Sequence, residues 1–204
     1  MMRFIGITGG IGAGKSTVLD YLKTHTNSEV LLADDLAREL MEPGTVLNQK
    51  LQEAFPKEFF DQSGAMIKEA FAKEIIGKEK ERKKLNALVH PAVKTEVLRR
   101  VEEHRKKQDI DYFFLEAALL IEDGYKELCD ELWYVSVTEE NRRRRLKESR
   151  GYSDERIDEM FAVQLQEYVF LENCCVVIDN NGTTEDTEEQ LKRILSLRKP
   201  RLLQ

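Results

Sequence analysis

The chain has 204 residues, of which 41% are hydrophobic, and it carries a formal net charge of −6. This length fits one large domain or a core with a modest insertion, and the acidic balance argues against a nucleic-acid binder, which normally has a basic excess. No apolar run approaches the ~20 residues that cross a bilayer, and no signal segment precedes the first apolar run. We therefore expect a cytoplasmic protein that binds neither nucleic acid nor membrane. The cysteines fit neither a disulfide framework nor a zinc site and are interpreted as small apolar residues at strand or helix positions: Cys129, Cys174 and Cys175.

The first predicted element is a short apolar run at residues 4–8, typical of a buried parallel strand, and apolar residues at helical spacing follow from Thr17 to Lys23. Between them, residues 9–17 match the phosphate-binding P-loop pattern G-x-x-x-x-G-K-[ST]. The glycines let backbone N–H groups turn towards a phosphate, Lys15 reaches the terminal phosphates, and the Ser16 hydroxyl can bind Mg²⁺. We expect the phosphates of a nucleotide to bind at Gly10, Ile11, Gly12, Ala13, Gly14, Lys15, Ser16 and Thr17.

The rest of the chain alternates between strand and helix patterns, which predicts an α/β protein with a five-stranded parallel sheet. With the P-loop, this is a P-loop NTPase-type three-layer fold. The further strands are expected at residues 29–33, 112–116, 132–137 and 175–179. Residues 36–108 are too many for a simple crossover and are interpreted as an inserted helical subdomain. Breaks between its helices are expected at Pro43-Gly44, Pro56, Ser63-Gly64 and His90-Pro91.

Residues 139–167 are expected to form two short helices joined at Gly151, with Ser153 as a cap of the second helix, an arrangement typical of a mobile lid. Four consecutive arginines, residues 142–145, lie in the first of these helices. Only Arg142 and Arg145 share a helix face, at i and i+3, so at least two of the four are expected to be solvated. The remaining ranges are assigned to the nucleotide-binding core: 1–35, 109–138 and 168–204.

Two acidic residues end predicted strands, where ligands of an open parallel sheet bind. Asp34 follows the second strand and could accept a proton from an attacking hydroxyl, or it could cap the helix at residues 36–41, a role that Asp35 fills equally well. Glu116 ends the third strand and could hold Mg²⁺ or its waters, or it could be an ordinary surface carboxylate. His90 could contact a substrate phosphate or carbonyl, or simply cap a helix.

Several segments, in order along nearly the whole chain, resemble those of the dephospho-coenzyme A kinase family. Residues 8–16 are similar to its T-G-G-I-G-S-G-K-S loop. Further matches are residues 33–38 with 42–45 to D-A-D-x-I-A-R…E-P-G-T, 85–93 to L-N-x-I-x-H-P-x-V, 118–122 to P-L-L-F-E, Gln164 to a lid glutamine, and 177–182 to V-I-x-N-x-G. The P-loop alone indicates the superfamily of P-loop proteins. The E-P-G-T and H-P segments are the features that point to this family within it.

The resemblance implies a kinase that uses MgATP to phosphorylate the 3′-hydroxyl of dephospho-CoA, the last step of CoA biosynthesis. It implies that the helical insertion binds CoA and that Asp34 is the general base. Lys15 and the loop would bind ATP, with Ser16 and Glu116 at the metal. Arg142 or Arg145 would contact phosphate in catalysis. The other implied site residues are Arg38, His90 and Glu122 for the acceptor, and Arg150, Asn180 and Gly182 for ATP.

The chain departs from the family's pattern at a few positions: Leu32, Ala118, Met160 and the pair Cys174-Cys175. Met160 stands in place of a lid arginine, which Arg156 could replace. One alternative is a P-loop kinase for another small nucleotide or hydroxylated acceptor. A nucleotide-dependent regulatory binding protein is a further alternative, although the sequence has no N-K-x-D guanine-reading segment. We expect a monomer or a weak homo-oligomer.

Overall fold

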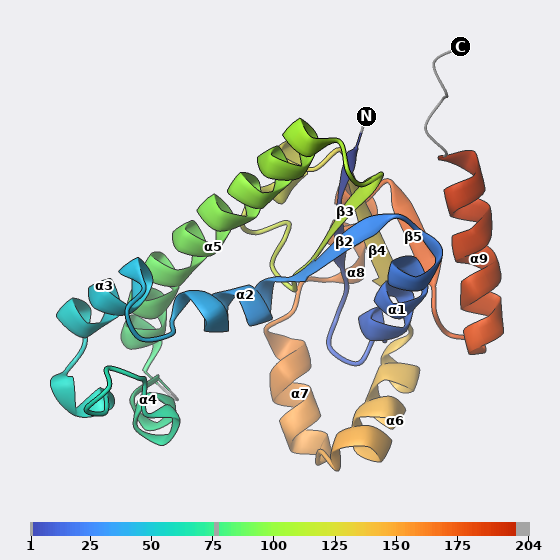
Figure 1. The fold of residues 1–204 in the computed structure, drawn as a ribbon. Coiled ribbons are helices and arrows are strands. Elements are labelled where there is room, and N and C mark those ends of the chain that lie inside the picture. Colours follow the sequence, from blue (N-terminus) through green and yellow to red (C-terminus); the bar gives the residue numbers. More distant parts are fainter. Residues whose placement is uncertain (1, 76–77, 199–204) are drawn as a thin grey trace. The chain divides into compact units, whose positions relative to one another are not determined.

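The computed structural model describes residues 2–75 and 78–198, and the chain divides into two compact units (Figure 1). The larger unit comprises Met1–Leu31 and His104–Gln204, and the smaller unit comprises Leu32–Glu103. The smaller unit begins and ends a few residues earlier in the chain than the helical subdomain predicted at residues 36–108. Residues 139–167 are grouped with the sheet in the larger unit and do not form a unit of their own.

The larger unit is built on a five-stranded parallel sheet, as predicted. Its strand order is β2-β3-β1-β4-β5. The strands are β1 (Arg3–Thr8), β2 (Ser28–Leu32), β3 (Tyr112–Glu116), β4 (Glu131–Ser136) and β5 (Val176–Asp179). β1 is the middle strand, and its Ile7 lies opposite Glu116 on one side and Trp133 on the other. The segment that leaves β1 therefore starts between the ends of β3 and β4.

Both faces of the sheet are covered. Tyr134 of β4 stacks on Phe170 of α8 (Glu167–Asn173), with 4.6 Å between the ring centroids. Its neighbours Trp133 and Val135 point to the opposite face, because side chains alternate along a strand, and both are completely buried. The other helices of this layered unit are α1 (Lys15–His25) and α9 (Thr184–Leu197), which pack against each other. This confirms the predicted α/β fold class.

The smaller unit is helical and has its own apolar core. It contains α2 (Ala33–Leu40), α3 (Val46–Ala54), the 3₁₀ turn η1 (Lys57–Phe59), α4 (Lys68–Ile75) and most of α5 (Glu79–Lys107). Phe71 lies at the centre of an aromatic cluster, with ring centroids 5.2–5.6 Å from it: Phe55, Phe59 and Phe60. Leu47 and Leu51 complete the buried cluster, which explains why this stretch folds as a compact body.

The predicted helix break at His90-Pro91 is wrong, because α5 continues through both residues. Pro91 has no N–H to donate to the carbonyl of Ala87, which normally costs about 3 kcal/mol in a helix interior. Ala87 and Pro91 are both exposed, so water can bind the carbonyl of Ala87. A buried stripe at i, i+4 and i+8, formed by Val93, Val97 and Val101, holds the following turns in place.

Two boundaries also differ from expectation. α2 begins at Ala33, directly after β2, so Asp34 and Asp35 lie in its first turn and neither is the cap, which is Leu32. Carboxylates in the first turn still suit the positive end of the helix dipole. β5 begins at Val176, so Cys175 precedes the strand and Cys174 is the C-cap of α8.

The expected placement of the cysteines within strands or helices is therefore wrong. Two of them are nevertheless small apolar side chains packed in the protein. Cys129 is partly buried in the loop before β4, and Cys174 is buried. Burial raises the pKa of each of these two thiols to about 12. They stay protonated and unreactive at neutral pH, whereas Cys175 is exposed.

The helix–glycine–helix prediction for residues 139–167 is confirmed in its geometry. α6 (Glu139–Arg150) ends at Gly151, whose φ of 62° is left-handed, and Ser153 caps α7 (Asp154–Ala162) by accepting from the Arg156 N–H. α6 leads away from the sheet and α7 returns towards it (Figure 1). Within residues 2–75 and 78–198, no helix is long and apolar enough to cross a membrane.

At the start of β4, Glu131 ties three distant parts of the larger unit together. Its carboxylate lies 2.7 Å from Arg3 Nη1 and 2.7 Å from Arg198 Nε, and it accepts from the indole N–H of Trp133 at 2.9 Å. Burial alone would raise the pKa of Glu131. The hydrogen bonds from Trp133 and Arg198 and the nearby charges outweigh it, so this pKa lies below its usual value.

We predict that Glu131→Gln lowers the free energy of unfolding at pH 7 by about 1–3 kcal/mol, because hydrogen bonds to a charged group are lost. A carboxyl whose pKa is lowered by folding stabilises the protein above its unfolded pKa, near 4.5, and that stabilisation is lost as the pH falls through its folded value. The difference between variant and wild type should therefore shrink below pH 4.5. Denaturant unfolding followed by Trp133 fluorescence measures it, with the exposed Glu127→Gln as the control. A difference that is the same at pH 7 and pH 3 would contradict the assignment.

Candidate active site

The segment between β1 and α1 folds as a phosphate-binding loop. Gly14 is the N-cap of α1 and has a φ of 78°, a left-handed conformation that a side chain would strain. Ala13 N–H donates to the carbonyl of Gly10 at 3.1 Å, which closes the loop. The first N–H groups of an α-helix lack partners within the helix, although that of Thr17 donates to the Gly14 carbonyl at 3.1 Å, and this end of the helix dipole is positive. The predicted loop residues 10–17 thus present the features of an anion site.

Lys15 and Glu116 come together beside this loop. The ammonium of Lys15 donates to the Gly9 carbonyl at 2.9 Å and lies 3.3 Å from Glu116 Oε1. Both side chains are mostly buried, at 16% and 17% exposed. The alternative that Glu116 is an ordinary surface carboxylate is therefore wrong, and the ion pair holds Lys15 over the start of the loop.

The residues predicted for a metal fit Mg²⁺. Ser16 and Glu116 offer a hydroxyl and carboxylate oxygens, which are the hard ligands that this ion prefers. Mg²⁺ in kinases keeps several waters and binds substrate phosphates, so few protein ligands are needed. In residues 2–75 and 78–198, no group of three or more His, Cys, Asp or Glu side chains could hold a metal by itself. A cation at this place would need the phosphates as ligands.

Arg142 reaches from α6 to the start of the loop. Its Nη1 would be only 1.8 Å from a Cβ on Gly10, so a larger residue there would displace the guanidinium. The guanidinium lies over the ring of Phe161, 4.2 Å from the centroid, and Nη1 donates to Gln164 Oε1 at 2.8 Å. Burial lowers the pKa of Arg142, which nevertheless stays charged at neutral pH. A half-buried cation is thus held against the loop.

Arg145 lies on the same face of α6 and reaches the other end of the loop. Its Nη2 donates to the carbonyl of Asn180 at 2.6 Å, and its Nη1 would be 3.4 Å from a Cβ on Gly14. The side chain of Asn180 is buried and donates to the Ala13 carbonyl at 2.8 Å, while it accepts from the Thr187 hydroxyl at 2.8 Å. Asn180 therefore holds the loop and Arg145 together.

The other two arginines of the run serve elsewhere, as expected for at least two of the four. Arg143 pairs with Glu139 of α6 and with Asp154 and Asp158 of α7, and so joins the two helices. Arg144 lies beside Glu148 on an exposed surface. The run thus divides into two cations at the loop and two at the surface.

Comparison with known proteins gives this site a family. The family model described as dephospho-CoA kinase matches residues 3–186. The chain belongs to the dephospho-CoA kinase family. It is 36% identical over 199 residues to a dephospho-CoA kinase of Geobacter sulfurreducens, covering 98% of this chain and all of that one, and 34% identical over 196 residues to one of Corynebacterium glutamicum, covering 96% of each.

Two solved structures share the fold of this chain. TT1252 from Thermus thermophilus superposes with a TM-score of 0.79 at 31% identity, covering 98% of this chain and 99% of that one. Dephospho-CoA kinase from Campylobacter jejuni has a TM-score of 0.71 at 18% identity, with 96% of each chain covered. The second likeness supports the fold alone.

The acceptor residues named for a dephospho-CoA kinase lie on different elements. Asp34 is exposed in the first turn of α2, and Arg38 pairs with Asp35 at 2.7 Å. His90 lies in the middle of α5. Glu122 lies in the turns after β3, where the surrounding protein partly desolvates its carboxyl and raises its pKa.

The remaining lid candidates are exposed. Arg150 is the last residue of α6, about 12 Å along the helix from Arg142, and its guanidinium lies 6.0 Å from the ring centroid of Tyr152. Arg156, which could replace the arginine missing at Met160, pairs with Glu159 at the surface.

Gly182, expected near ATP, lies in the turn before α9, where a Cβ would be 2.6 Å from the Asp186 carboxylate.

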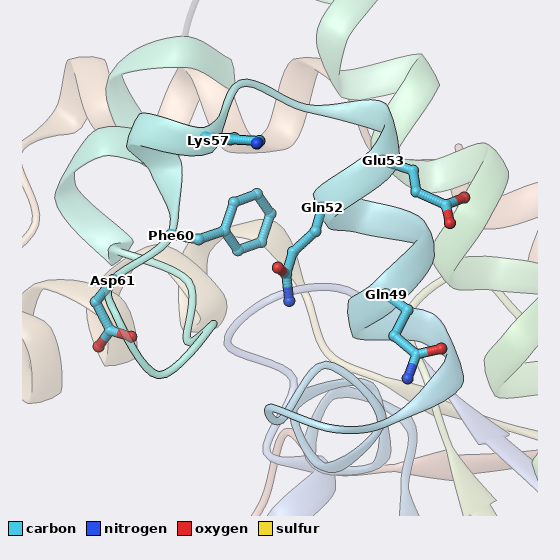
Figure 2. Close-up of a pocket in the computed structure, with 6 residues that line it drawn as sticks. All are labelled: Gln49, Gln52, Glu53, Lys57, Phe60 and Asp61. Atoms are coloured by element: carbon cyan, nitrogen blue, oxygen red, sulfur yellow. The ribbon is translucent and has the colours of Figure 1, made fainter.

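The helical unit contains a pocket that the sequence did not indicate (Figure 2). Its volume is about 500 Å³, and it is lined by Gln49, Gln52, Glu53, Lys57, Phe60 and Asp61. The ring of Phe60 faces Gln52 in Figure 2, and the Gln52 amide donates to Asn48 at 2.6 Å. The Asp61 carboxylate accepts hydrogen bonds from the backbone N–H groups of Ser63 and Ala65. Lys57 brings a cation to this polar pocket.

Sequence reasoning missed what Phe161 and Asn180 do. Phe161 lies below Arg142, a contact between two helices that no sequence pattern signals. Asn180 was expected at the ATP site, which stays a prediction, and the structure adds that both ends of its amide bond to the protein. The available signal was an asparagine directly after the last predicted strand. Asn180 is buried there, and buried amides need hydrogen-bond partners.

We predict that Asn180→Ala raises the KM for ATP about tenfold, because the loop loses its bond at Ala13 and Arg145 loses a fixed neighbour. Stability should also fall by about 1–3 kcal/mol, since the Ala13 carbonyl is left without its donor. The matched control is Asn181→Ala, whose side chain bonds to Thr138 and Asp179 rather than to the loop. Steady-state kinetics with varied ATP measures the effect, and an equal rise in both variants would argue against a role in holding the loop.

Proposed function

We propose that this protein transfers the γ-phosphoryl group of MgATP to the ribose 3′-hydroxyl of dephospho-CoA, giving coenzyme A and ADP. Family membership over nearly the whole chain supports the acceptor. The observation that carries the reaction type is the phosphate loop with three cations fixed on it: Lys15, Arg142 and Arg145. We further propose a cytoplasmic location, where ATP is abundant, and a monomer or weak homo-oligomer.

The three cations suit a phosphoryl transfer. Negative charge on the oxygens of the transferring group is stabilised by positive groups that are already in place before the reaction. Lys15 is held by Glu116 and Gly9, and Arg142 by Phe161 and Gln164, so neither has to be ordered when ATP binds. Ser16 and Glu116 would hold Mg²⁺, whose charge offsets that of the β- and γ-phosphates.

Asp34 is proposed as the group that accepts the proton of the 3′-hydroxyl. Its position supports this role, because it follows β2 directly, and in open parallel sheets ligands bind beyond the carboxyl ends of strands. Its carboxylate is exposed, whereas the neighbouring Asp35 is paired with Arg38. Arg38, His90 and Glu122 are proposed acceptor contacts, and Arg150, Asn180 and Gly182 are proposed to lie near ATP, in each case from the family resemblance.

The helical unit is proposed to hold the remote part of dephospho-CoA. The pantetheine arm of that substrate carries two amides, and the pocket in Figure 2 offers amide side chains, an aromatic ring and Lys57. Binding energy from a remote arm helps to orient the reacting hydroxyl. A pocket that discriminates between acceptors in this way would affect the KM of the acceptor rather than that of ATP.

The central test is ADP release with MgATP and dephospho-CoA, compared with adenosine, AMP, shikimate, gluconate and no acceptor. We expect strong stimulation by dephospho-CoA alone, with a product heavier by one phosphate. Asp34→Asn should lower kcat about 10²–10⁴-fold, the range of a general base, and Lys15→Ala should lower it severely. The control is Asp35→Asn in the same helical turn, with near-normal kcat. Near-normal turnover in Asp34→Asn would remove Asp34 as the base, and no stimulation by dephospho-CoA would refute the acceptor.

We predict that Lys57→Ala raises the KM for dephospho-CoA about tenfold and leaves the KM for ATP unchanged. Lys50→Ala is the matched control, because Lys50 is exposed on α3 and does not line the pocket. Steady-state kinetics with each substrate varied in turn measures both constants. Equal constants in the two variants would mean that the pocket does not bind the acceptor.

A further inference from the structure

Arg142 has a support formed by Phe161 and Gln164, a role that the family resemblance does not assign to either residue. Its guanidinium lies between the phosphate loop and the turn that ends α7. On one side, Gly10 leaves room for Nη1, which would be 1.8 Å from a Cβ at that position. On the other side are the ring of Phe161, 4.2 Å from Cζ, and the amide oxygen of Gln164, 2.8 Å from Nη1. A long, flexible side chain is thus held in one conformation.

The two supporting groups are themselves fixed by the chain. The Gln164 backbone N–H donates to the Phe161 carbonyl at 3.1 Å, so one turn presents both side chains together. α7 is held to α6 by Asp154, which lies 3.1 Å from Arg143 and 2.8 Å from Lys147, and by Asp158, which lies 2.6 Å from Arg143. The position of the ring therefore depends on a network of ion pairs at the surface.

Arg142 meets the loop next to the residue that Lys15 contacts. Lys15 bonds to the carbonyl of Gly9, and in P-loops this lysine reaches the β- and γ-phosphates. Gly10, which Arg142 contacts, is the next residue. The Nε of Arg142 is also buried, and among the described residues it has no hydrogen-bond partner. A phosphate oxygen that reached it would satisfy a donor that is now costly.

We propose that Phe161 and Gln164 are positioning residues that hold Arg142 at the γ-phosphate. This inference rests on the proposed kinase function only in that ATP is the donor; it does not require dephospho-CoA as the acceptor. Phe161 acts through a cation–π contact and Gln164 through its amide oxygen. The pair fixes the lid arginine that lies at Gly10.

The test measures the affinity for MgATP and for MgADP by calorimetry, with no acceptor present. We expect Arg142→Ala, Phe161→Leu and Gln164→Ala each to weaken MgATP binding about tenfold and MgADP binding less than threefold, because only ATP has the γ-phosphate. Phe161→Tyr should restore near-normal MgATP affinity, since it keeps the aromatic face. A loss of affinity that is equal for both nucleotides would overturn the proposal.

A double-mutant cycle separates positioning from general damage to the fold. If Phe161 acts through Arg142, adding Phe161→Leu to Arg142→Ala should cause no further loss of MgATP affinity. Arg144 is the control, because it lies on α6 beside Glu148 at an exposed surface and takes no part in the ion pairs that hold α7. In an Arg144→Ala background, Phe161→Leu should keep its full tenfold effect. Additive losses with Arg142→Ala would contradict the proposal.

This design distinguishes two failures. If the acceptor is wrong, dephospho-CoA gives no turnover, yet the nucleotide affinities still follow the predicted pattern. If the positioning inference is wrong, turnover with dephospho-CoA is intact and the three variants lose no selectivity for MgATP over MgADP. Where turnover is measurable, Phe161→Leu should lower kcat by more than it changes the KM for the acceptor.

Discussion

A single methyl group on Gly10 would lie 1.8 Å from the guanidinium of Arg142, and this close approach constrains the rest of the site. The phosphate loop must stay open to anions while cations are packed against it, so Gly10 leaves room for Arg142 on one side and a support holds Arg142 on the other. Phe161 and Gln164 support Arg142, and Asn180 fixes Ala13 and Arg145. The charge at the loop is therefore in place before any phosphate binds.

The sheet and the loop could be predicted because their signals are local. β3 was predicted with its exact bounds, since Tyr112–Glu116 is a short apolar run that is buried along its length. The break at His90-Pro91 failed because a proline penalty of about 3 kcal/mol is offset by tertiary burial of Val93, Val97 and Val101. The packing of a long helix on a core thus outweighs the local preference of proline to end a helix.

The sequence indicated which side chains lie at the loop and not the groups that support them. The motif gave Lys15, and helical spacing correctly separated Arg142 and Arg145 from their two neighbours. The ring of Phe161 came from a different helix, 19 residues after Arg142, and such a contact exists only after the Gly151 turn has brought α7 back along α6. The pocket around Lys57 likewise depends on how α3 and η1 pack, which hydrophobic spacing does not specify.

The most direct test of the account is hydrogen exchange of the backbone amides of residues 9–17, measured with and without saturating MgATP. If the loop N–H groups bind the phosphates, their exchange should slow strongly when ATP binds, and by less in the Asn180→Ala variant. Loop amides that exchange at the same rate in both states, while calorimetry shows ATP bound, would contradict the claim that this loop is the phosphate site.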